Sequence, residues 1–309
     1  MDKAKPGFFD YFLLVTLAAI FGSSFMLVGV IVDEIPSVTL VTLRLGITAL
    51  IFLAAMIFVK QRLPAPGRTW ITIIGVAVFG NVAPFFLISW GQEKVDAGLA
   101  AIFIACMPLM TIVLAHFVTQ DEKLTMFKIV GFCFGLLGVV LIIGFDKLGT
   151  LGENTVRQYA VVGAALGYAI SAIISKTLTD MPRMSMMSAI MLSSTLFIIP
   201  FGLISGETSK VLAGPWPSVK VIMSMIILAV VPTAIGTMII FVILSRQGAS
   251  FLSQINFMVP VFAILWSMVF LSEILPANAL YALALILAGV AIARINSKSK
   301  IAQTKEINS

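Results

Sequence analysis

One charged side chain lies well inside an apolar stretch of this sequence, and it belongs to an arginine. Arg44 stands seven residues after Ser37 in a run that stays apolar as far as Val59. A guanidinium offers paired donors that match a carboxylate or a phosphate, so Arg44 is a candidate for binding an anionic group. The alternative role is structural, because the same side chain can extend toward water or cap backbone carbonyls. Because charge in lipid is unfavourable, we expect Arg44 to face the protein interior or a water-filled cavity.

Uncharged polar residues in other apolar stretches are further candidates, because they form hydrogen bonds without adding net charge. Ser250, Ser253, Gln254 and Phe257 are spaced to share one helical face, so that face is polar for about two turns. Such residues can also serve only to bond neighbouring helices, and Trp90 suits the aromatic belt at a membrane surface. The predicted substrate-binding or cavity-lining residues are Ser24, Arg44, Asn81, Trp90, Ser171, Thr233, Thr237, Ser253 and Gln254.

Two prolines occupy the middle of apolar runs. A proline inside a helix has no N–H to donate and crowds the carbonyl four residues back, which frees a backbone acceptor. Interrupted spans at corresponding positions are a pointer to the binding site of a transporter. Pro108 and Pro260 are therefore candidates for gating or for lining a cavity, and a kink that serves only packing is the alternative.

The sequence contains few residues of the types that catalytic sites use. The chain has two Cys and one His, and it lacks the His-Glu-x-x-His motif of metalloproteases. We therefore expect no enzyme activity, no metal and no cofactor. The apolar runs also lack Asp and Glu, which commonly relay protons inside membranes. This favours facilitated diffusion or exchange, and a proton path through edge residues such as Glu93 or Asp96 is the alternative.

The elements that carry these residues are predicted to be membrane-spanning helices. The chain is 60% hydrophobic and only 11% charged, whereas soluble domains carry about 25% charged residues. A helix of roughly 20 apolar residues crosses the bilayer core. Ten runs have about this length: 12–32, 37–59, 70–90, 98–118, 126–145, 159–178, 184–204, 221–243, 249–271 and 277–295. The sequence thus predicts an all-α integral membrane protein with ten transmembrane helices.

The distribution of basic residues predicts the orientation of these helices. With the N-terminus inside, fourteen of the 20 Lys and Arg residues fall in cytoplasmic segments and five on the opposite side, with Arg44 inside a span. Excess basic residues mark cytoplasmic loops. We therefore expect a multi-pass protein of the cell inner (plasma) membrane with both termini cytoplasmic, including a cytoplasmic tail at 296–309. The net charge of +6 then requires no nucleic-acid partner.

The two halves of the chain share landmarks at a nearly constant offset. Pro36 and Pro182 each open a span, 146 residues apart. Pro108 matches Pro260 at an offset of 152, and Ser24 matches Ser171 at 147. Five spans in each half force the second copy to lie upside down relative to the first. Inverted repeats are typical of secondary transporters, in which two halves expose a central site alternately to each side.

These residues resemble the EamA family of the drug/metabolite transporter superfamily. The resemblance rests on Gly-Ser-Ser-Phe25, Leu43-Arg44, Gly98 followed by Pro108, an acidic residue before the fifth span, and Gly135 to Gly138 within it. It differs from the commoner family pattern in having Ser23-Ser24 where a Trp-Gly-x-Asn type of motif is usual. It implies two five-helix repeats, at 12–145 and 159–295, around a central cavity. The implied function is transport of small metabolites such as amino acids, with export the expected direction and another small organic solute the alternative.

Two pairs of glycines have the spacing that lets helices approach closely. Gly131 and Gly135 form one Gly-x-x-x-Gly pair, and Gly163 and Gly167 form the other. In a ten-helix bundle this spacing favours packing within one chain, and dimerisation is the alternative. We therefore expect a monomer in the lipid bilayer with a small-molecule substrate as its partner, and a dimer as the second possibility.

Overall fold

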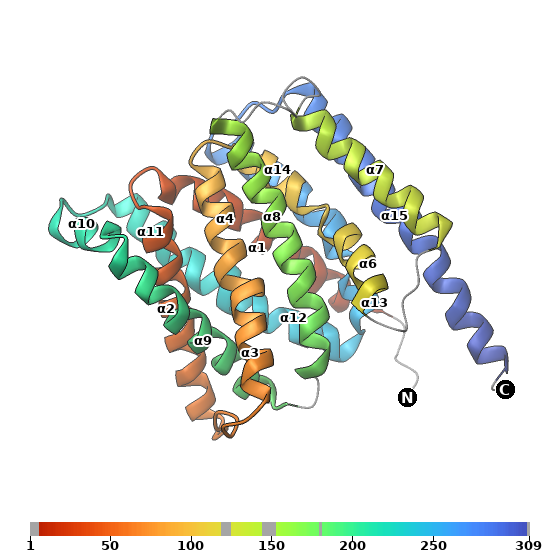
Figure 1. Cartoon of the computed structure of the whole chain (residues 1–309), viewed down its shortest axis with the longest axis horizontal. Helices are drawn as coiled ribbons and strands as arrows, with labels where there is room; N and C mark the ends of the chain where they lie inside the picture. Colours follow the sequence, from red (N-terminus) through yellow and green to blue (C-terminus); the bar gives the residue numbers. More distant parts are fainter. Residues whose placement is uncertain (1–5, 119–124, 144–152, 179–180, 308–309) are drawn as a thin grey trace.

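The structure of this protein is a computed structural model, which describes residues 6–118, 125–143, 153–178 and 181–307. Within these ranges every regular element is a helix (Figure 1). Six of the ten predicted spans are formed by one continuous α-helix each. These are α1 (Phe8–Val32), α2 (Ser37–Phe58), α7 (Met126–Ile143), α8 (Glu153–Ser175, extended by the short 3-10 turn η3, Lys176–Leu178), α9 (Arg183–Ile204) and α15 (Ala277–Ile307).

The other four spans are interrupted, and the interruptions match between the two halves. The third and eighth spans each contain a π-helical turn, whereas the fourth and ninth are each broken into two α-helices. The segments are α3 (Thr69–Ala77), η1 (Val78–Val82) and α4 (Ala83–Gln92); α5 (Ala97–Ile104) and α6 (Met107–Val118); α11 (Val219–Leu228), η4 (Ala229–Ile235) and α12 (Gly236–Arg246); and α13 (Ala249–Leu252) and α14 (Ile255–Phe270). A further short helix, α10 (Glu207–Ala213), precedes α11.

The lengths and apolarity of these helices identify a multi-pass membrane protein. Seven spans among the described residues are long and apolar enough to cross a membrane, and three shorter apolar helices accompany them, at Met126–Leu141, Ile255–Phe270 and Ala277–Ile292. A helix satisfies its own backbone hydrogen bonds, as a segment surrounded by lipid requires. The predicted fold class, an all-α membrane protein of about ten helices in two halves, is confirmed.

The two halves interlock rather than stand side by side. Helix α1 of the first half packs against α14 of the second, and α2 packs against α9. Along one edge α7 and α15, the last spans of the two halves, run together as a pair (Figure 1). Helices α1, α2, α4 and α5 of the first half thus contact the second half, and a site between the halves draws residues from both.

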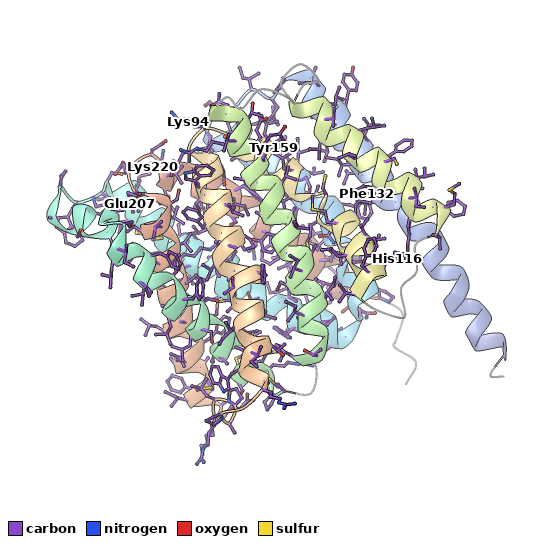
Figure 2. All side chains as sticks on the ribbon, viewed as in Figure 1. Lys94, His116, Phe132, Tyr159, Glu207 and Lys220 are labelled. Atoms are coloured by element: carbon purple, nitrogen blue, oxygen red, sulfur yellow. The ribbon has the colours of Figure 1, made fainter. Side chains whose placement is uncertain are left out.

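The bundle has two distinguishable ends. The one near the chain termini, called the terminal end, lies toward the lower right of Figure 1. The opposite one, called the far end, carries the connections α1–α2, α4–α5, α9–α11 and α14–α15. In Figure 2, Lys94, Glu207 and Lys220 lie toward the far end, while His116 lies toward the terminal end.

Three boundaries differ from those predicted. Helix α1 begins at Phe8, four residues before the predicted span, so that Asp10 lies in its first turn. Helix α8 begins at Glu153, which places Arg157 inside the helix rather than in a loop. Helix α15 continues to Ile307, so the predicted tail at 296–309 is helical as far as that residue. Polar residues are compatible with helix ends, and no Gly or Pro follows Gly289 to end the last helix.

The glycine pairs serve contacts within the chain. A Cβ added at Gly289 of α15 would contact the Gly131 carbonyl oxygen and lie 3.0 Å from the Gly135 nitrogen, so α7 and α15 approach at backbone distance. A Cβ at Gly167 of α8 would lie 3.1 Å from the carbonyl oxygen of Phe79. Among the described residues, these glycines therefore serve packing within one chain, as predicted.

Candidate functional site

A cavity of about 490 Å³ lies in the centre of the bundle, between the two halves. This volume is in the range of small-molecule sites, about 300 to 1,000 Å³. Its wall is mostly apolar and is formed by residues of α1, α2, η1, α4, α5, α6, α8, α9, η4, α12, α13 and α14 and of the breaks between them. The polar lining residues are Ser24, Arg44, Asn81, Tyr168, Thr233, Thr237, Ser253 and Asn256. Among the described lining residues, Arg44 is the one that carries a charge.

A proline in the eighth span alters the hydrogen bonding around Thr233, the residue that Arg44 contacts. Pro232 has no N–H, so the carbonyl of Leu228, four residues earlier, loses its usual helical donor. In the π turn η4 the backbone donor to this carbonyl comes from five residues further on, and the Thr233 hydroxyl also donates to the Leu228 oxygen, at 2.8 Å. Its single proton is then occupied, and its oxygen accepts a hydrogen bond from Arg44 Nε at 2.9 Å. The proline thus fixes the orientation of the hydroxyl that Arg44 meets.

Arg44 is buried, and its described partners are neutral. Its side chain is 94% buried, since 6% of the residue surface is exposed. The guanidinium carbon lies 3.6 Å from the centre of the Phe85 ring, and Nη2 lies 3.5 Å from Ser24 Oγ. A cation over an aromatic face is stabilised by about 0.5 to 2 kcal/mol. No described Asp or Glu forms an ion pair with Arg44, so its charge is solvated by dipoles and a ring.

The environment of Arg44 is repeated, without the charge, in the other half. Thr48, one turn after Arg44, donates to the Ala229 carbonyl at 3.1 Å. Ser194 is the residue equivalent to Thr48, at the offset of 146 that relates Pro36 to Pro182. Its hydroxyl lies 3.4 Å from the Ala77 carbonyl, just as the Thr48 hydroxyl lies close to the Ala229 carbonyl. Asn81, at the position equivalent to Thr233, donates from Nδ2 to Ser194 Oγ at 3.1 Å. The residue equivalent to Arg44 is Ile190, so the two halves differ in charge at this place.

The breaks in the fourth and ninth spans open the wall of the cavity. Helix α5 ends at Ile104 and α6 starts at Met107, and Ala105 between them lines the cavity. Pro108 is therefore the second residue of α6 rather than a mid-helix kink, because it cannot donate to Ile104 and its ring crowds that carbonyl. Pro260 lies inside α14 and lines the cavity.

The structure brings six of the nine predicted polar site residues to the cavity, namely Ser24, Arg44, Asn81, Thr233, Thr237 and Ser253. The other three lie outside the lining. Ser171 is buried against Gly80, and Gln254 is exposed next to the break before α14. Trp90 lies at the far end, where the Arg157 guanidinium carbon is 3.8 Å from the centre of its ring.

Sequence reasoning missed Asn256, Tyr168 and Phe85, which also line the cavity. The prediction for the ninth span assumed one continuous helix, in which Ser253, Gln254 and Phe257 share a face. Because the chain turns at Ser253–Gln254, the face that follows is shifted, and Asn256 lies at the cavity. Phe257 instead packs with the cluster around Leu109, and the side chain of Ser250 lies outside the described part. Pro232 next to Thr233 was the one local signal for the partner of Arg44.

Carboxylates link the two halves at the far end. Glu93 accepts a hydrogen bond from Ser37 at 2.5 Å and forms an ion pair with Arg157 at 2.7 Å. Glu273 accepts from the backbone nitrogens of Ala97 and Gly98, at 2.8 and 3.1 Å, and so caps the start of α5. This arrangement uses the positive end of the helix dipole.

Two further acidic groups at the far end have shifted pKa values. Hydrogen bonds from the Ser218 nitrogen and hydroxyl, at 2.6 and 2.7 Å, hold the pKa of Glu34 below its usual range. Partial burial and the nearby Glu273 carboxylate raise the pKa of Asp96. Within the described residues, no three His, Cys, Asp or Glu side chains come together in a way that could hold a metal ion. The site can therefore bind a solute by hydrogen bonds, charge and apolar contact.

Comparison with known proteins agrees with this architecture. A sequence model of the EamA-like transporter family matches twice, at residues 9–144 and 158–295. The chain is 23% identical over 284 residues to the "Uncharacterized transporter YoaV" of Bacillus subtilis (strain 168), covering 90% of this chain and 94% of that protein. It is 26% identical over 291 residues to a "Probable amino-acid metabolite efflux pump" of Salmonella typhimurium, covering 92% and 94%.

A solved crystal structure has the same fold, with a TM-score of 0.63 at 20% identity over 93% of this chain and 98% of that one. The two family matches together cover most of the sequence, and each contains five of the ten predicted spans. The chain therefore belongs to the EamA-like transporter family and is a membrane transporter rather than an enzyme.

Proposed function

We propose that this protein is a secondary transporter that exports amino acids and related small metabolites by alternating access. The observation that carries the proposal is the central cavity, which both halves line and which meets a broken helix from each of them. Interrupted helices at equivalent positions of two repeats are where transporters place their binding sites. The name of the Salmonella relative, an amino-acid metabolite efflux pump, supports the choice of solute and direction.

The proposal assigns the solute contacts to the six polar residues that line the cavity and were predicted from the sequence. Ser24, Arg44, Asn81, Thr233, Thr237 and Ser253 supply donors and acceptors within a mostly apolar wall. The interruptions beside Pro108 and Pro260 are proposed as the places where the fourth and ninth spans bend during the cycle. The excess of basic residues in the segments on the side of the termini supports an inner-membrane protein with both termini cytoplasmic.

We propose facilitated diffusion or exchange as the mode of transport. No Asp, Glu or His is among the described residues that line the cavity, so an intramembrane proton carrier is not at hand there. The alternative is a proton-coupled carrier of metabolites or drugs, and one observation favours it. Asp96, whose pKa is raised, lies beside Glu273 at the far end, where it is placed to bind a proton as that end opens.

Counterflow in proteoliposomes tests the proposal. Vesicles that contain the purified protein are preloaded with one unlabelled solute from a panel of amino acids, nucleosides, sugars and cationic drugs, and uptake of the same labelled solute is followed. We expect amino-acid counterflow without an ion gradient. Uptake that occurs only with a pH gradient would favour the proton-coupled alternative, and absence of counterflow for every solute in the panel would contradict the proposed function.

A further inference from the structure

We propose that Arg44 binds the carboxylate of the solute and Asn81 binds its ammonium group, so that the cavity selects zwitterionic α-amino acids with apolar side chains and rejects organic cations. The inference rests on the proposed function, because it takes the central cavity as the transport site. It adds how the solute is oriented in the cavity and which solutes are excluded.

Arg44 has donor capacity that no described residue uses, and its charge has no anionic partner among the described residues. Its Nε donates to Thr233 at 2.9 Å, and Nη2 is at the outer limit of a hydrogen bond to Ser24, at 3.5 Å. Its Nη1 has no hydrogen bond to a described residue. Buried charges in proteins are normally paired, because an uncompensated one is strongly disfavoured. An anion that enters the cavity would supply the missing partner, and a carboxylate fits the two Nη groups.

Asn81 offers the complementary acceptor. The Ser194 hydroxyl donates its proton to the Ile190 carbonyl at 2.8 Å, so its oxygen accepts from Asn81 Nδ2 at 3.1 Å. This contact fixes the amide with its nitrogen toward Ser194, and Oδ1 has no hydrogen bond to a described residue. An amide oxygen without a donor is a suitable acceptor for an ammonium group.

Arg44 and Asn81 line the same cavity. Asn81 precedes Phe85 by four residues along the third span, and both line the cavity. Residues at this spacing are about one helical turn apart. The Arg44 guanidinium lies over the Phe85 ring. The carboxylate and ammonium of an α-amino acid are attached to the same carbon, which suits a donor that lies over Phe85 and an acceptor four residues before it.

The asymmetry between the halves sets the orientation of the solute in the cavity. Thr233 and Asn81 occupy equivalent positions, but Arg44 is matched by the apolar Ile190. Only one side of the duplicated cavity can therefore attract an anion. The apolar part of the solute is left with a wall that includes Met191, Ile240 and Val259. An organic cation would meet the positive charge of Arg44 and no carboxylate among the described lining residues.

Three probes that share one aromatic group separate these contributions. Phenylalanine carries both charges, 3-phenylpropionate lacks the ammonium, and 2-phenylethylamine lacks the carboxylate. Binding is measured as the rise in the melting temperature of the purified protein in detergent, because a ligand of the folded state stabilises it. We expect phenylalanine to give the largest shift, 3-phenylpropionate a smaller one and 2-phenylethylamine none.

Two variants and two matched controls assign the groups. Arg44→Gln should weaken phenylalanine binding about 10- to 100-fold, as expected for the loss of a charge-assisted pair. Arg44→Lys keeps the charge without the paired donors; it should bind more weakly than wild type but still exclude 2-phenylethylamine. Asn81→Ala should remove the advantage of phenylalanine over 3-phenylpropionate. Arg183→Gln and Asn278→Ala change exposed residues of the same types and should bind as wild type does.

The outcomes separate this inference from the proposed function. Melting shifts with 2-phenylethylamine as large as those with phenylalanine would overturn the inference, as would unchanged phenylalanine binding in folded Arg44→Lys and Asn81→Ala. If such a protein still shows counterflow of another solute, the transporter proposal stands and only the assignment of the site is wrong. Phenylalanine binding without counterflow of any solute would support the site and contradict transport.

Discussion

The hydrogen bond between Thr233 and Arg44 should make a measurable contribution to the stability of the bundle. Replacing Thr233 by Val keeps the shape of the side chain and removes the hydroxyl. The change leaves Arg44 Nε without its partner, now at 2.9 Å, and removes the hydroxyl that donates to the Leu228 carbonyl at 2.8 Å. Arg44 and Leu228 are both buried.

The expected size of the effect follows from two ranges. Hydrogen bonds to charged groups contribute about 1.5 to 3 kcal/mol in soluble proteins. Those between membrane helices average about 0.6 kcal/mol and reach about 1.7 kcal/mol. The buried, charged Arg44 loses a partner here and the Leu228 carbonyl loses one of its donors, so we expect a loss of about 2 kcal/mol, or roughly 30-fold in the folding equilibrium.

Reversible unfolding of the purified protein in detergent micelles measures this difference. Thr237→Val is the matched control, because the Thr237 hydroxyl donates to the Thr233 carbonyl within the same helix. We expect it to change the free energy of unfolding by less than about 0.5 kcal/mol. Thr233→Ser restores the hydroxyl and should recover most of the loss. A Thr233→Val protein within about 0.5 kcal/mol of wild type would refute the argument that the proline-prepared hydroxyl stabilises Arg44.

Three other predictions concern packing and the far end. Gly22→Ala places a Cβ 2.7 Å from the Phe262 Cβ. Thermal unfolding should show that this change lowers the free energy of unfolding by about 1 to 3 kcal/mol. Gly46→Ala, whose Cβ would lie 3.9 Å from its nearest neighbour, is the control and should be neutral or stabilising. Glu273→Ala removes the cap of α5 and should lower the free energy of unfolding by about 1 kcal/mol; an unchanged value would argue against the cap. Because the pKa of Asp96 is raised in the folded state, its favourable contribution is full below the unfolded pKa and is lost as pH rises through the folded pKa. Asp96→Asn should therefore raise the melting temperature at pH 7 and not at acidic pH, and the reverse pattern would contradict the assigned repulsion.

The sequence by itself determined the architecture of the membrane domain. A helix in lipid must satisfy its backbone within the segment, so apolar runs of about 20 residues mark spans without knowledge of their neighbours. The landmarks at a constant offset, such as Pro36 and Pro182, likewise showed the duplication from local chemistry. Arg44 could be selected as a candidate because one charge in an apolar run is unfavourable wherever the run packs.

The tertiary structure decided which candidates meet. Arg44 and Thr233 are 189 residues apart, and Asn81 and Ser194 are 113 apart, so their contacts depend on how helices from different halves cross. The helix breaks determined the other lining residues, because a break rotates the side chains that follow it relative to those that precede it. The break at Ser253–Gln254 brings Asn256 to the cavity and leaves Gln254 exposed, although both stand in one continuous apolar run. Backbone hydrogen bonding within a span is a local property, whereas the faces that line a cavity are fixed only when all the helices pack together.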